Sequence, residues 1–339
     1  MNTNPPLISI APMLDWSDRH YRYFMRQISQ KVILYSEMIV ADAILHGHRD
    51  RLLSFNPLEQ KLVLQLGGSD PKKLYQASAI AASYGYTELN LNCGCPSPRV
   101  QSGNFGACLM EDPLLVADCV RAMQDGGGVP VTIKQRIGLD YNYDYSLLTK
   151  FVDLVAEAGC TTFIVHARNA VLHGLSPKDN REVPPLRYDF VYRLKADFPQ
   201  LNIILNGGIK TTSTIHEHLN QVDGVMLGRE AYHNPYICAD FDQEFYQLAP
   251  QVCLSRTEVA LAMLPYLERH VANGGRIHHV LRHMLGLFHG AKGAKLWRQE
   301  LSRQMHAPST KWREDYLKLL MDLEEQQEHS GNKNNVTAT

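Results

Sequence analysis

Short apolar segments recur eight times between residues 7 and 227, and helix-like stretches separate them. Most of these segments are continuous apolar runs, which is typical of parallel strands buried on both faces. The expected strands span residues 7–11, 32–36, 62–66, 88–91, 131–134, 162–166, 202–205 and 224–227. Eight consecutive β-α units favour a (β/α)8 TIM barrel, an α/β fold, over an open sheet.

Helix signals support this division of the chain. Asp70-Pro71 and Asp112-Pro113 stand where two of the intervening helices should begin, because Asp caps a helix and Pro fits its first turn. Beyond Pro250 the strand pattern stops, and a helical bundle is expected. Its four helices should span 257–272, 278–288, 294–305 and 312–325. We therefore predict a barrel domain over 1–245, a helical domain over 246–325 and a disordered polar tail over 326–339.

Composition narrows the class of protein. Hydrophobic residues make up 45% and charged residues 20% of the 339 residues, and no apolar run approaches the length of a membrane span. The seven cysteines are odd in number and scattered, which favours a reduced, cytoplasmic protein. Cys93 and Cys95 have no second pair nearby, so we expect no metal there. His279 and His283 lie four apart without the Glu of a zincin motif, and we expect core or RNA-facing histidines.

Charge is distributed unevenly along the chain. The formal net charge is −1, yet residues 251–313 hold ten Lys and Arg against three Asp and Glu, a net +7. A basic helical segment on an acidic body indicates a polyanionic partner. A solvated helical surface explains the same charge equally well, and the sequence leaves both interpretations open.

The carboxyl ends of the expected strands carry polar, glycine and sulfur-containing residues. In a TIM barrel these ends line the mouth where chemistry takes place. Reading along the chain, the candidates are Pro12, Met13, Glu37, Met38, Gln65, Asn90, Asn92, Cys95, Lys134, His166, Asn206, Gly207, Gly208, Gly228 and Arg229. Any one of them is weak evidence, but a complete set of eight strand ends predicts an active site.

The last two strand ends resemble a phosphate site. Glycines in Asn206-Gly207-Gly208 and Gly228-Arg229 let backbone N–H groups approach a phosphate closely. Lys134 and His166 should project beside them, and Lys134 suits the N1/O2 edge of a reduced flavin. The alternative for Lys134 is a buried ion pair. No G-x-G-x-x-G motif follows a strand, so the set predicts FMN rather than a dinucleotide domain.

Taken together, these motifs resemble the tRNA-dihydrouridine synthase family over nearly the whole chain. They are Ala11-Pro12-Met13, Gln65-Leu66-Gly67, Asn90-Leu91-Asn92-Cys93-Gly94-Cys95-Pro96, Lys134, Val165-His166-Ala167-Arg168, Asn206-Gly207-Gly208-Ile209 and Leu227-Gly228-Arg229. The stretch 174–186, Asn92 and Leu296-Trp297-Arg298 resemble the bacterial A-type branch. That branch modifies uridines 20 and 20a of the tRNA D loop.

The resemblance implies a reaction and a set of roles. NADPH reduces FMN, hydride passes to C6 of uracil, and Cys95 protonates C5; Cys95 is taken over Cys93 because Pro96 follows it. The implied FMN contacts are Pro12, Met13, Gln65, Lys134, His166, Asn206, Gly207, Gly208, Gly228 and Arg229. The implied tRNA contacts are Asn92, Lys178, Arg181, Arg298 and Arg303. A cytoplasmic monomer that binds neither DNA nor membranes is expected.

Two other functions fit part of the sequence. An FMN barrel that reduces a free small molecule, as dihydroorotate or dihydropyrimidine dehydrogenases do, explains the barrel and Cys95 but not the basic helical segment. An RNA-binding or chaperone protein on a barrel scaffold explains the charge but not the strand ends. A flavin absorbance spectrum and a test of tRNA dependence separate the three.

Overall fold

The computed structural model describes residues 5–247, 253–307 and 309–334, with side chains as far as Gln326. The chain forms two compact units. We call Met1–Ser17 with Val32–Gly228 the barrel unit, and Asp18–Lys31 with Arg229–Thr339 the helical unit. Each is described separately.

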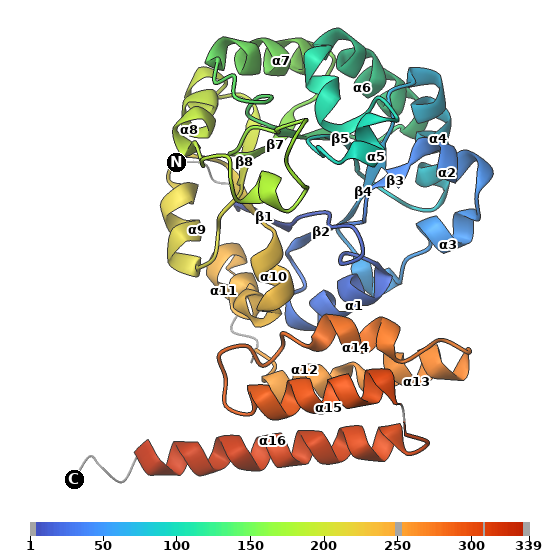
Figure 1. Cartoon of the computed structure of the whole chain (residues 1–339), viewed down its shortest axis with the longest axis vertical. Helices are drawn as coiled ribbons and strands as arrows, with labels where there is room; N and C mark the ends of the chain where they lie inside the picture. Colours follow the sequence, from blue (N-terminus) through green and yellow to red (C-terminus); the bar gives the residue numbers. More distant parts are fainter. Residues whose placement is uncertain (1–4, 248–252, 308, 335–339) are drawn as a thin grey trace. The chain divides into compact units, whose positions relative to one another are not determined.

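A closed sheet of parallel strands forms the centre of the barrel unit (Figure 1). β2 pairs with β1 through Ser9 and Ile33 and with β4 through Leu34 and Leu62, so the first strands close on one another. The strands are β1 (Leu7–Ile10), β2 (Ile33–Tyr35), β3 (Ile39–Val40), β4 (Leu62–Gly67), β5 (Leu89–Cys93), β6 (Val131–Arg136), β7 (Thr162–His166), β8 (Asn202–Asn206) and β9 (Gly224–Leu227). The predicted eight-stranded barrel is confirmed, and the two-residue β3 is an addition on the edge of β4.

Apolar side chains from opposite strands fill the barrel interior. Tyr35 of β2, Val63 of β4, Ile164 of β7, Ile204 of β8 and Met226 of β9 form one buried cluster. Branched and aromatic side chains pack the centre, as in other barrels of this type, so the space beneath the strand ends is a core and not a pore.

Helices surround the strands of the barrel unit (Figure 1). Asp70 and Asp112 cap two of them by accepting backbone N–H bonds, and Pro71 and Pro113 follow, as the sequence predicts. The α-helices are α2 (Ala41–His46), α3 (Arg49–Leu53), α4 (Pro71–Ser83), α5 (Pro98–Gln101), α6 (Pro113–Gly127), α7 (Tyr145–Glu157), α8 (Tyr188–Asp197) and α9 (Thr212–Leu219). Short 3-10 turns are η1 (Pro57–Glu59), η2 (Gly106–Glu111) and η3 (Asp179–Arg181).

The helical unit is built from helices at both ends of the sequence. They are α1 (Arg19–Ile28), α10 (Arg229–His233), η4 (Pro235–Cys238), α11 (Phe241–Tyr246), α12 (Arg256–Ala262), α13 (Leu264–Ala272), α14 (His278–Met284), α15 (Ala294–His306) and α16 (Trp312–Asn334). Trp297 and Tyr316 are almost fully buried between them, and the Trp297 Nε1–H donates to the Met284 carbonyl at 2.8 Å. α1 packs against α12 and α14.

The helices differ from the sequence prediction in three places. The expected helix 257–272 is divided at Met263 because Pro265, in the first turn of α13, has no N–H to continue the helix. α16 extends to Asn334, past residue 326 where a tail was expected, through Glu and Gln residues that favour helix. The compact units divide after Gly228 and include α1 on the helical side, unlike the predicted boundary at 245. Residues 335–339 of the expected tail lie outside the described residues.

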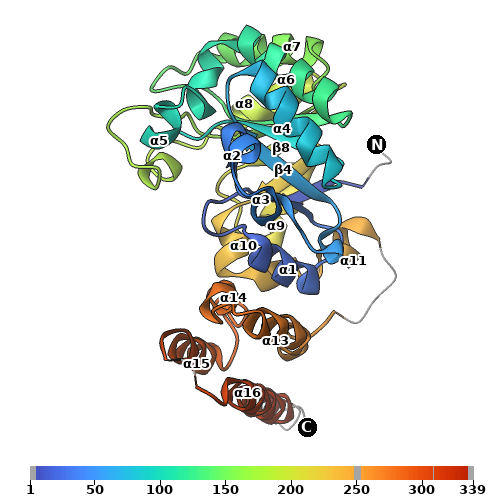
Figure 2. The same cartoon turned by 90° about the vertical axis from the view of Figure 1, so that its right-hand side faces the viewer.

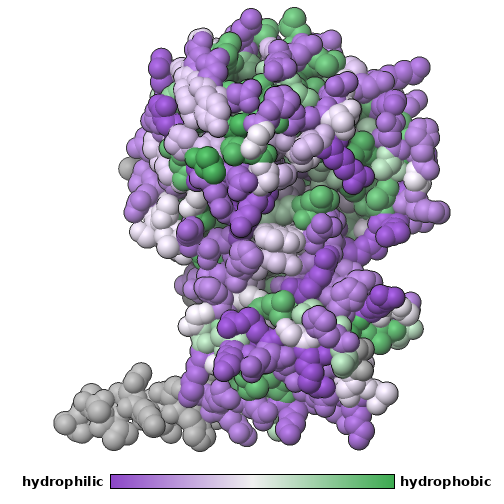
Figure 3. Space-filling model, in the orientation of Figure 1, coloured by the Kyte–Doolittle hydropathy of each residue, from purple (hydrophilic) through white to green (hydrophobic). Residues whose placement is uncertain are grey.

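The face drawn in Figure 3 is largely hydrophilic, and its apolar residues lie in small separate patches. Among the helices that the structure describes, none combines the length and the apolar character that a membrane crossing requires.

Asp18 joins two helices of the helical unit, and its removal should destabilise the fold. Its carboxylate caps α1 by accepting the N–H groups of His20 and Tyr21, and it also accepts from Arg282 at 2.7 Å and His283 at 3.0 Å. Burial raises the pKa of Asp18, but the hydrogen bond and charge of His283 outweigh burial and hold it well below its usual value. We expect Asp18→Ala to lower the free energy of unfolding by about 2–4 kcal/mol at neutral pH.

The free energy of unfolding lost in Asp18→Ala should depend on pH, because folding lowers the pKa of the Asp18 carboxyl group. A carboxyl group whose pKa is lower in the folded state stabilises the fold above its unfolded pKa of about 3.9, and the contribution fades as pH falls below that. Urea titrations at neutral and acidic pH measure the difference between wild type and Asp18→Ala. A difference that stays constant into the acid range would contradict the proposed ion-pair contribution.

Candidate active site

Cys95 lies in a tight turn directly after β5, and its backbone is held from both sides. The Asn92 side-chain oxygen accepts the N–H groups of Gly94 at 3.1 Å and Cys95 at 3.0 Å. From the other side, Ala107 N–H donates to the Cys95 carbonyl at 2.9 Å. Gly106 makes this approach possible, because its φ is +79° and a Cβ there would lie 2.6 Å from the Cys95 oxygen. The thiol is therefore carried on a fixed backbone.

The two neighbouring thiols differ in access. Cys93, the last residue of β5, has no exposed surface, and burial raises its pKa well above the usual value. Cys95 is partly exposed, and both are free thiols. A substrate at the strand ends can reach only the second of these groups. The geometry thus favours Cys95 for chemistry, as the sequence pattern does.

Buried amides form a ladder beneath this turn. Asn92 Nδ2 donates to Gln65 Oε1 at 2.9 Å, Gln65 Nε2 donates to Asn90 Oδ1 at 2.8 Å, and Asn90 Nδ2 donates to Thr132 Oγ1 at 2.9 Å. All four side chains are buried. We expected Asn92 to contact tRNA and Gln65 to contact the cofactor. Their amides bond to each other inside the barrel, because a buried amide needs hydrogen-bond partners, and Asn92 also holds the Cys95 turn. The contacts expected with tRNA and with the cofactor stay predictions from the sequence.

Lys134 projects from β6 toward β8 without a carboxylate partner. Its Nζ donates to Asn206 Oδ1 at 3.2 Å, and Asn206 Nδ2 donates to the Met226 carbonyl at 2.7 Å. Burial lowers the pKa of Lys134 to about 7, and the charge of Arg136 acts in the same direction. Among the described residues no acid pairs with Lys134, so the alternative of a buried ion pair finds no support. A desolvated cation of this kind suits an electron-rich ligand.

His166 lies at the same level of the barrel. It pairs with Arg136 of β6 and Asn206 of β8 in the strand register. Its Nδ1 is buried and forms no hydrogen bond with any described residue. Burial, followed by the charges of Arg136 and Lys134, lowers its pKa well below the usual value, so the imidazole is neutral at pH 7. Buried polar atoms usually have a hydrogen-bond partner, so we expect His166 Nδ1 to receive one from a ligand.

The glycines after β8 lie against this histidine. Gly207 has φ +113°, and a Cβ there would lie 3.0 Å from His166 Cδ2, while Tyr188 donates its hydroxyl to the Gly207 carbonyl at 2.8 Å. Gly208 has φ +75° and would place a Cβ 2.6 Å from the Tyr188 oxygen. Both positions favour glycine, because φ is positive and the side chains of His166, Leu186 and Tyr188 lie against them. Phosphate binding at these glycines stays a prediction from the sequence.

Arg136 is a site residue that the sequence analysis missed. It is buried, and its guanidinium donates to the carbonyls of Gly94 at 3.2 Å, Asn169 at 3.2 Å and Asn180 at 2.9 Å. Burial lowers its pKa to about 10, so it stays charged at neutral pH. It therefore ties the turn before Cys95 to the loop after β7. The expected strand ended at Lys134, whereas β6 runs to Arg136, and the i, i+2 spacing was the signal available.

The loop after β7 is joined to the Cys95 segment a second time. Gln101 Nε2, at the end of α5, donates to the carbonyls of Pro96 and Leu172, each at 2.8 Å. Figure 2 shows α5 and this yellow-green loop projecting from the same end of the barrel. Lys178 and Arg181, two expected tRNA contacts, are exposed on the loop. Both cations therefore lie on a loop that is hydrogen-bonded to the segment after Cys95.

The remaining expected cofactor residues take different positions. Pro12 and Met13 follow β1, and Met13 packs on the interior cluster. Gly228 follows β9, and a Cβ there would meet no atom within 4 Å. Arg229 is the first residue of α10 and belongs to the helical unit, so its contact with a phosphate stays a prediction from the sequence.

Ion pairs within the helical unit reduce the positive charge counted from the sequence. Arg303 bonds to Glu300 at 2.6 Å and Asp315 at 2.9 Å, and Arg282 bonds to Asp18 at 2.7 Å. Two of these acids, Asp18 and Asp315, lie outside residues 251–313. The net charge counted for that segment alone therefore overstates the positive charge of the helical unit. The exposed cations of this segment that form no ion pair with a described residue are Arg269, Arg276, Lys295, Arg298 and Lys311. Arg303 is consequently a weaker candidate for tRNA contact than Arg298.

Comparisons with known proteins agree with this geometry. The chain is 55% identical over 295 residues to "tRNA-dihydrouridine(20/20a) synthase" of Synechocystis sp., covering 87% of this chain and 88% of that protein. It is 55% identical to the protein of the same name from Shewanella oneidensis, with 88% of each chain covered. Among solved structures, the old yellow enzyme homologue from Zymomonas mobilis shares the fold, with a TM-score of 0.51 at 12% identity over 73% of this chain and 90% of that chain.

The family model described as Dihydrouridine synthase (Dus) matches residues 9–322, which run from within β1 through the rest of the barrel and all but the end of the helical segment. The expected family resemblance is confirmed. With the Cys95 turn, the half-buried Lys134 and the glycine loop after β8 in place, the chain belongs to the dihydrouridine synthase family.

Proposed function

We propose that this chain reduces uridine to 5,6-dihydrouridine at positions 20 and 20a of the tRNA D loop, with FMN as cofactor and NADPH as reductant. The observation that carries the proposal is the fixed, partly exposed Cys95 beside Lys134 and His166 at one barrel mouth. Membership of the dihydrouridine synthase family supplies the reaction class, a flavin-dependent oxidoreductase. Relatives above 50% identity carry the name that specifies the two positions.

The residues at the mouth fit a flavin. Lys134 is a half-buried cation with no acidic partner among the described residues, and His166 Nδ1 is a buried nitrogen that bonds to none of them. Gly207, which has a positive φ, lies against His166. Lys134 would hold the electron-rich edge of the ring, and Gly207, Gly208 and Gly228 would receive the phosphate. When bound and reduced, the flavin supplies the hydride for C6 of uracil.

Cys95 holds the proton that C5 of the base must receive. Its Sγ–H is a proton donor directly after the end of β5, and a thiol can act as a general acid. Asn92 and Arg136 hold the peptide group that joins Gly94 to Cys95, through the Cys95 N–H and the Gly94 carbonyl. This fixed position makes proton delivery stereospecific.

The substrate must bring its base out of folded RNA to reach a barrel mouth. Lys178 and Arg181 on the loop after β7, and Arg298 on α15, are the cations proposed to hold the surrounding phosphates. The seven free thiols are consistent with a reducing compartment, and a cytoplasmic monomer is part of the same proposal. DNA and membranes are not expected partners.

One experiment tests the whole proposal. The purified protein should show a flavin spectrum and should convert uridine to dihydrouridine in tRNA that lacks the modification, with NADPH consumed in equal amount. Mass spectrometry of nuclease fragments locates the product. Reduction of free uracil or orotate at the rate of tRNA would instead support the small-molecule alternative, and absence of flavin would support a binding protein.

Lys134→Met should raise the stability of the flavin-free protein and weaken its binding of flavin. Because the folded pKa of Lys134 is about 7 and the unfolded value about 10.4, the charged form destabilises the fold fully below about pH 7. This cost disappears as pH rises toward about 10. We expect the variant to raise the stability of flavin-free protein at about pH 6, with little gain near pH 10, and to weaken FMN binding roughly tenfold or more.

Urea unfolding of flavin-free protein and fluorescence titration with FMN give the two quantities for Lys134→Met. Lys150→Met on α7 is the matched control for a surface lysine. Equal FMN affinity in wild type and Lys134→Met would rule Lys134 out as a cofactor contact.

Arg298→Ala should weaken tRNA binding, whereas Arg303→Ala should act mainly on stability. Arg298 is exposed and forms no ion pair with the described residues, so its charge is free to contact phosphate. Arg303 joins α15 to α16 through Glu300 and Asp315. We expect Arg298→Ala to raise the KM for tRNA several-fold, with NADPH-driven flavin reduction unchanged. The slope of log affinity for tRNA against log salt concentration should become shallower by about one.

Binding titrations at several salt concentrations, beside a melting curve, compare these two variants. An Arg298→Ala protein with the wild-type salt slope and a lowered melting temperature would show that Arg298 braces the bundle and does not contact RNA.

A further inference from the structure

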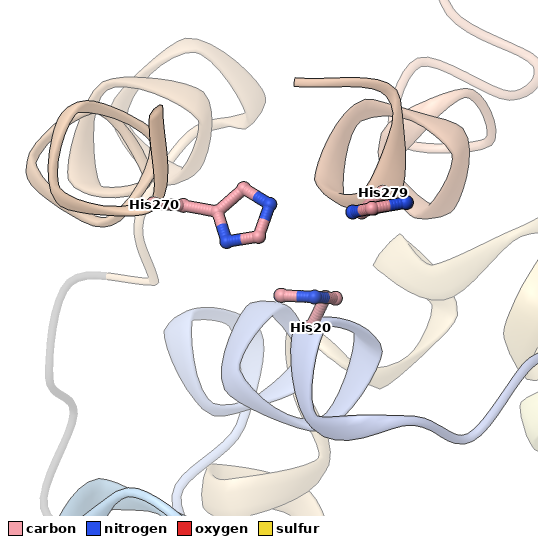
Figure 4. Close-up of side chains that lie close together, drawn as sticks. All are labelled: His20, His270 and His279. Atoms are coloured by element: carbon pink, nitrogen blue, oxygen red, sulfur yellow. The ribbon is translucent and has the colours of Figure 1, made fainter. Parts of the chain in front are cut away.

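Three histidines from distant parts of the sequence meet in the helical unit. His20 lies on α1, His270 on α13 and His279 on α14, and each is half-buried. One ring nitrogen of each lies within 4.8 Å of one nitrogen of both others. The ring centroids are 4.7 Å, 5.7 Å and 6.3 Å apart. Figure 4 shows the three imidazoles around one common space, each reaching it from a different helix.

Hydrogen bonds with the described residues occupy one ring nitrogen of His20 and one of His270, and none of His279. His20 Nδ1 bonds to the Tyr266 hydroxyl at 2.8 Å, which leaves Nε2 for another ligand. His270 Nε2–H donates to the Arg276 carbonyl at 3.2 Å, which leaves the Nδ1 lone pair. Neither ring nitrogen of His279 bonds to a described residue. A metal-binding histidine typically donates its other N–H to a carbonyl or hydroxyl in this way, because that bond fixes the tautomer and the ring direction.

We propose that His20, His270 and His279 bind one divalent cation of the zinc class, with water as the fourth ligand. Three imidazoles and a water form a tetrahedral set that Zn²⁺ accepts readily. In such a set the rings would lie about 5 Å apart and the nitrogens about 3.4 Å apart. The observed centroid distances bracket the first value, and rotation of the imidazoles about χ2 brings the nitrogens together. The site is independent of the proposed reaction at the barrel mouth.

The backbone beside His270 restricts where its ring can lie. Gly275, after α13, packs so closely that a Cβ there would lie 2.3 Å from both Cε1 and Nε2 of His270. The Gly275 N–H also donates to the His270 carbonyl at 2.9 Å. Any larger residue would push the imidazole out of its present position. Gly275 therefore holds His270 toward the other two rings.

A cation at this point would tie α1 to α13 and α14. Residues 18–31 reach the helical unit from the N-terminal part of the sequence, far from the segment that forms the other helices. α1 already packs against α14, and Asp18 bonds to Arg282 and His283 one turn away. Metal binding would add a link that closes a long loop of chain, which is where a cross-link stabilises most.

The test begins with the full chain, freed of metal by a chelator and desalted. ZnCl2 should bind with a stoichiometry of one in a calorimetric titration and should raise the melting temperature. CoCl2 should give the intense visible d–d bands of a four-coordinate site. His20→Ala, His270→Ala and His279→Ala should each lower the Zn²⁺ affinity by about 100-fold or more, and Tyr266→Phe by about tenfold. Gly275→Ala should lower it without removing any imidazole.

His278→Ala is the matched control, since it removes a neighbouring imidazole on the same helix and should leave the affinity within about threefold. Variants are compared only where circular dichroism shows wild-type helix content, and Gly275→Ala and Tyr266→Phe supply the answer if an alanine variant fails to fold. Absence of one-to-one binding in wild type would overturn the proposal. So would Zn²⁺ binding that survives all three alanine variants, or a loss of tRNA affinity in them without any metal binding, which would mark an RNA-contacting cluster instead.

Discussion

Cys95→Ala should lower the rate of dihydrouridine formation by about 10²–10⁴-fold while flavin content and tRNA affinity stay at wild-type values. The magnitude is that of removing a general acid from a reaction whose other groups remain in place. The backbone of the turn should persist, because its hydrogen bonds run through Cys95 N–H and C=O and not through the thiol. Single-turnover kinetics with prereduced enzyme and unmodified tRNA measure the step directly.

Cys93→Ala is the matched control for this prediction. It deletes a thiol two residues away that is completely buried, so it should cost about 1 kcal/mol of stability and change the rate only a few-fold. An inactive Cys93→Ala protein beside an active Cys95→Ala protein would reverse the assignment. Equal loss in both would mean that the turn as a whole, and not one thiol, limits the reaction.

Arg136→Met should reduce both stability and turnover. The substitution keeps an unbranched apolar side chain but removes the guanidinium, and the carbonyls of Gly94, Asn169 and Asn180 lose this donor. We expect the free energy of unfolding to fall by about 2–4 kcal/mol. Because Gly94 precedes Cys95, a shift of about 1 Å in the turn should lower kcat by up to about 10²-fold.

Arg168→Met separates the effect on the Cys95 turn from a general loosening of the loop after β7. Arg168 donates to the carbonyls of Glu182 and Pro184 in that loop. The Arg168→Met substitution should therefore affect tRNA binding more than kcat. Arg136→Lys should recover part of the stability, since an ammonium reaches fewer of the three carbonyls than a guanidinium fork does. An unaltered kcat in Arg136→Met would show that the Cys95 turn needs no support from β6.

Much of the site was predictable because each strand of a parallel barrel delivers its last residues to the same end. Apolar runs marked the strands, and the residues after them named Cys95, Lys134, His166 and Gly207 without any knowledge of contacts. The roles within the set were less accessible. Asn92 and Gln65 were expected as ligand contacts, and only the folded chain shows that adjacent strands set their buried amides side by side and that Asn92 also holds the Cys95 turn.

By itself, the amino-acid sequence determined the barrel, the helical segment, the thiol and the family, since these depend on local patterns and on short motifs read along the chain. The tertiary structure alone decided which cations are already paired, that Arg136 joins two loops, and that α1 belongs with the C-terminal helices. It also brought His20 to His270 and His279. The physical reason is that pairing, burial and coordination depend on distances between residues that are 12 to 264 positions apart in these pairs, and only the folded chain sets these distances.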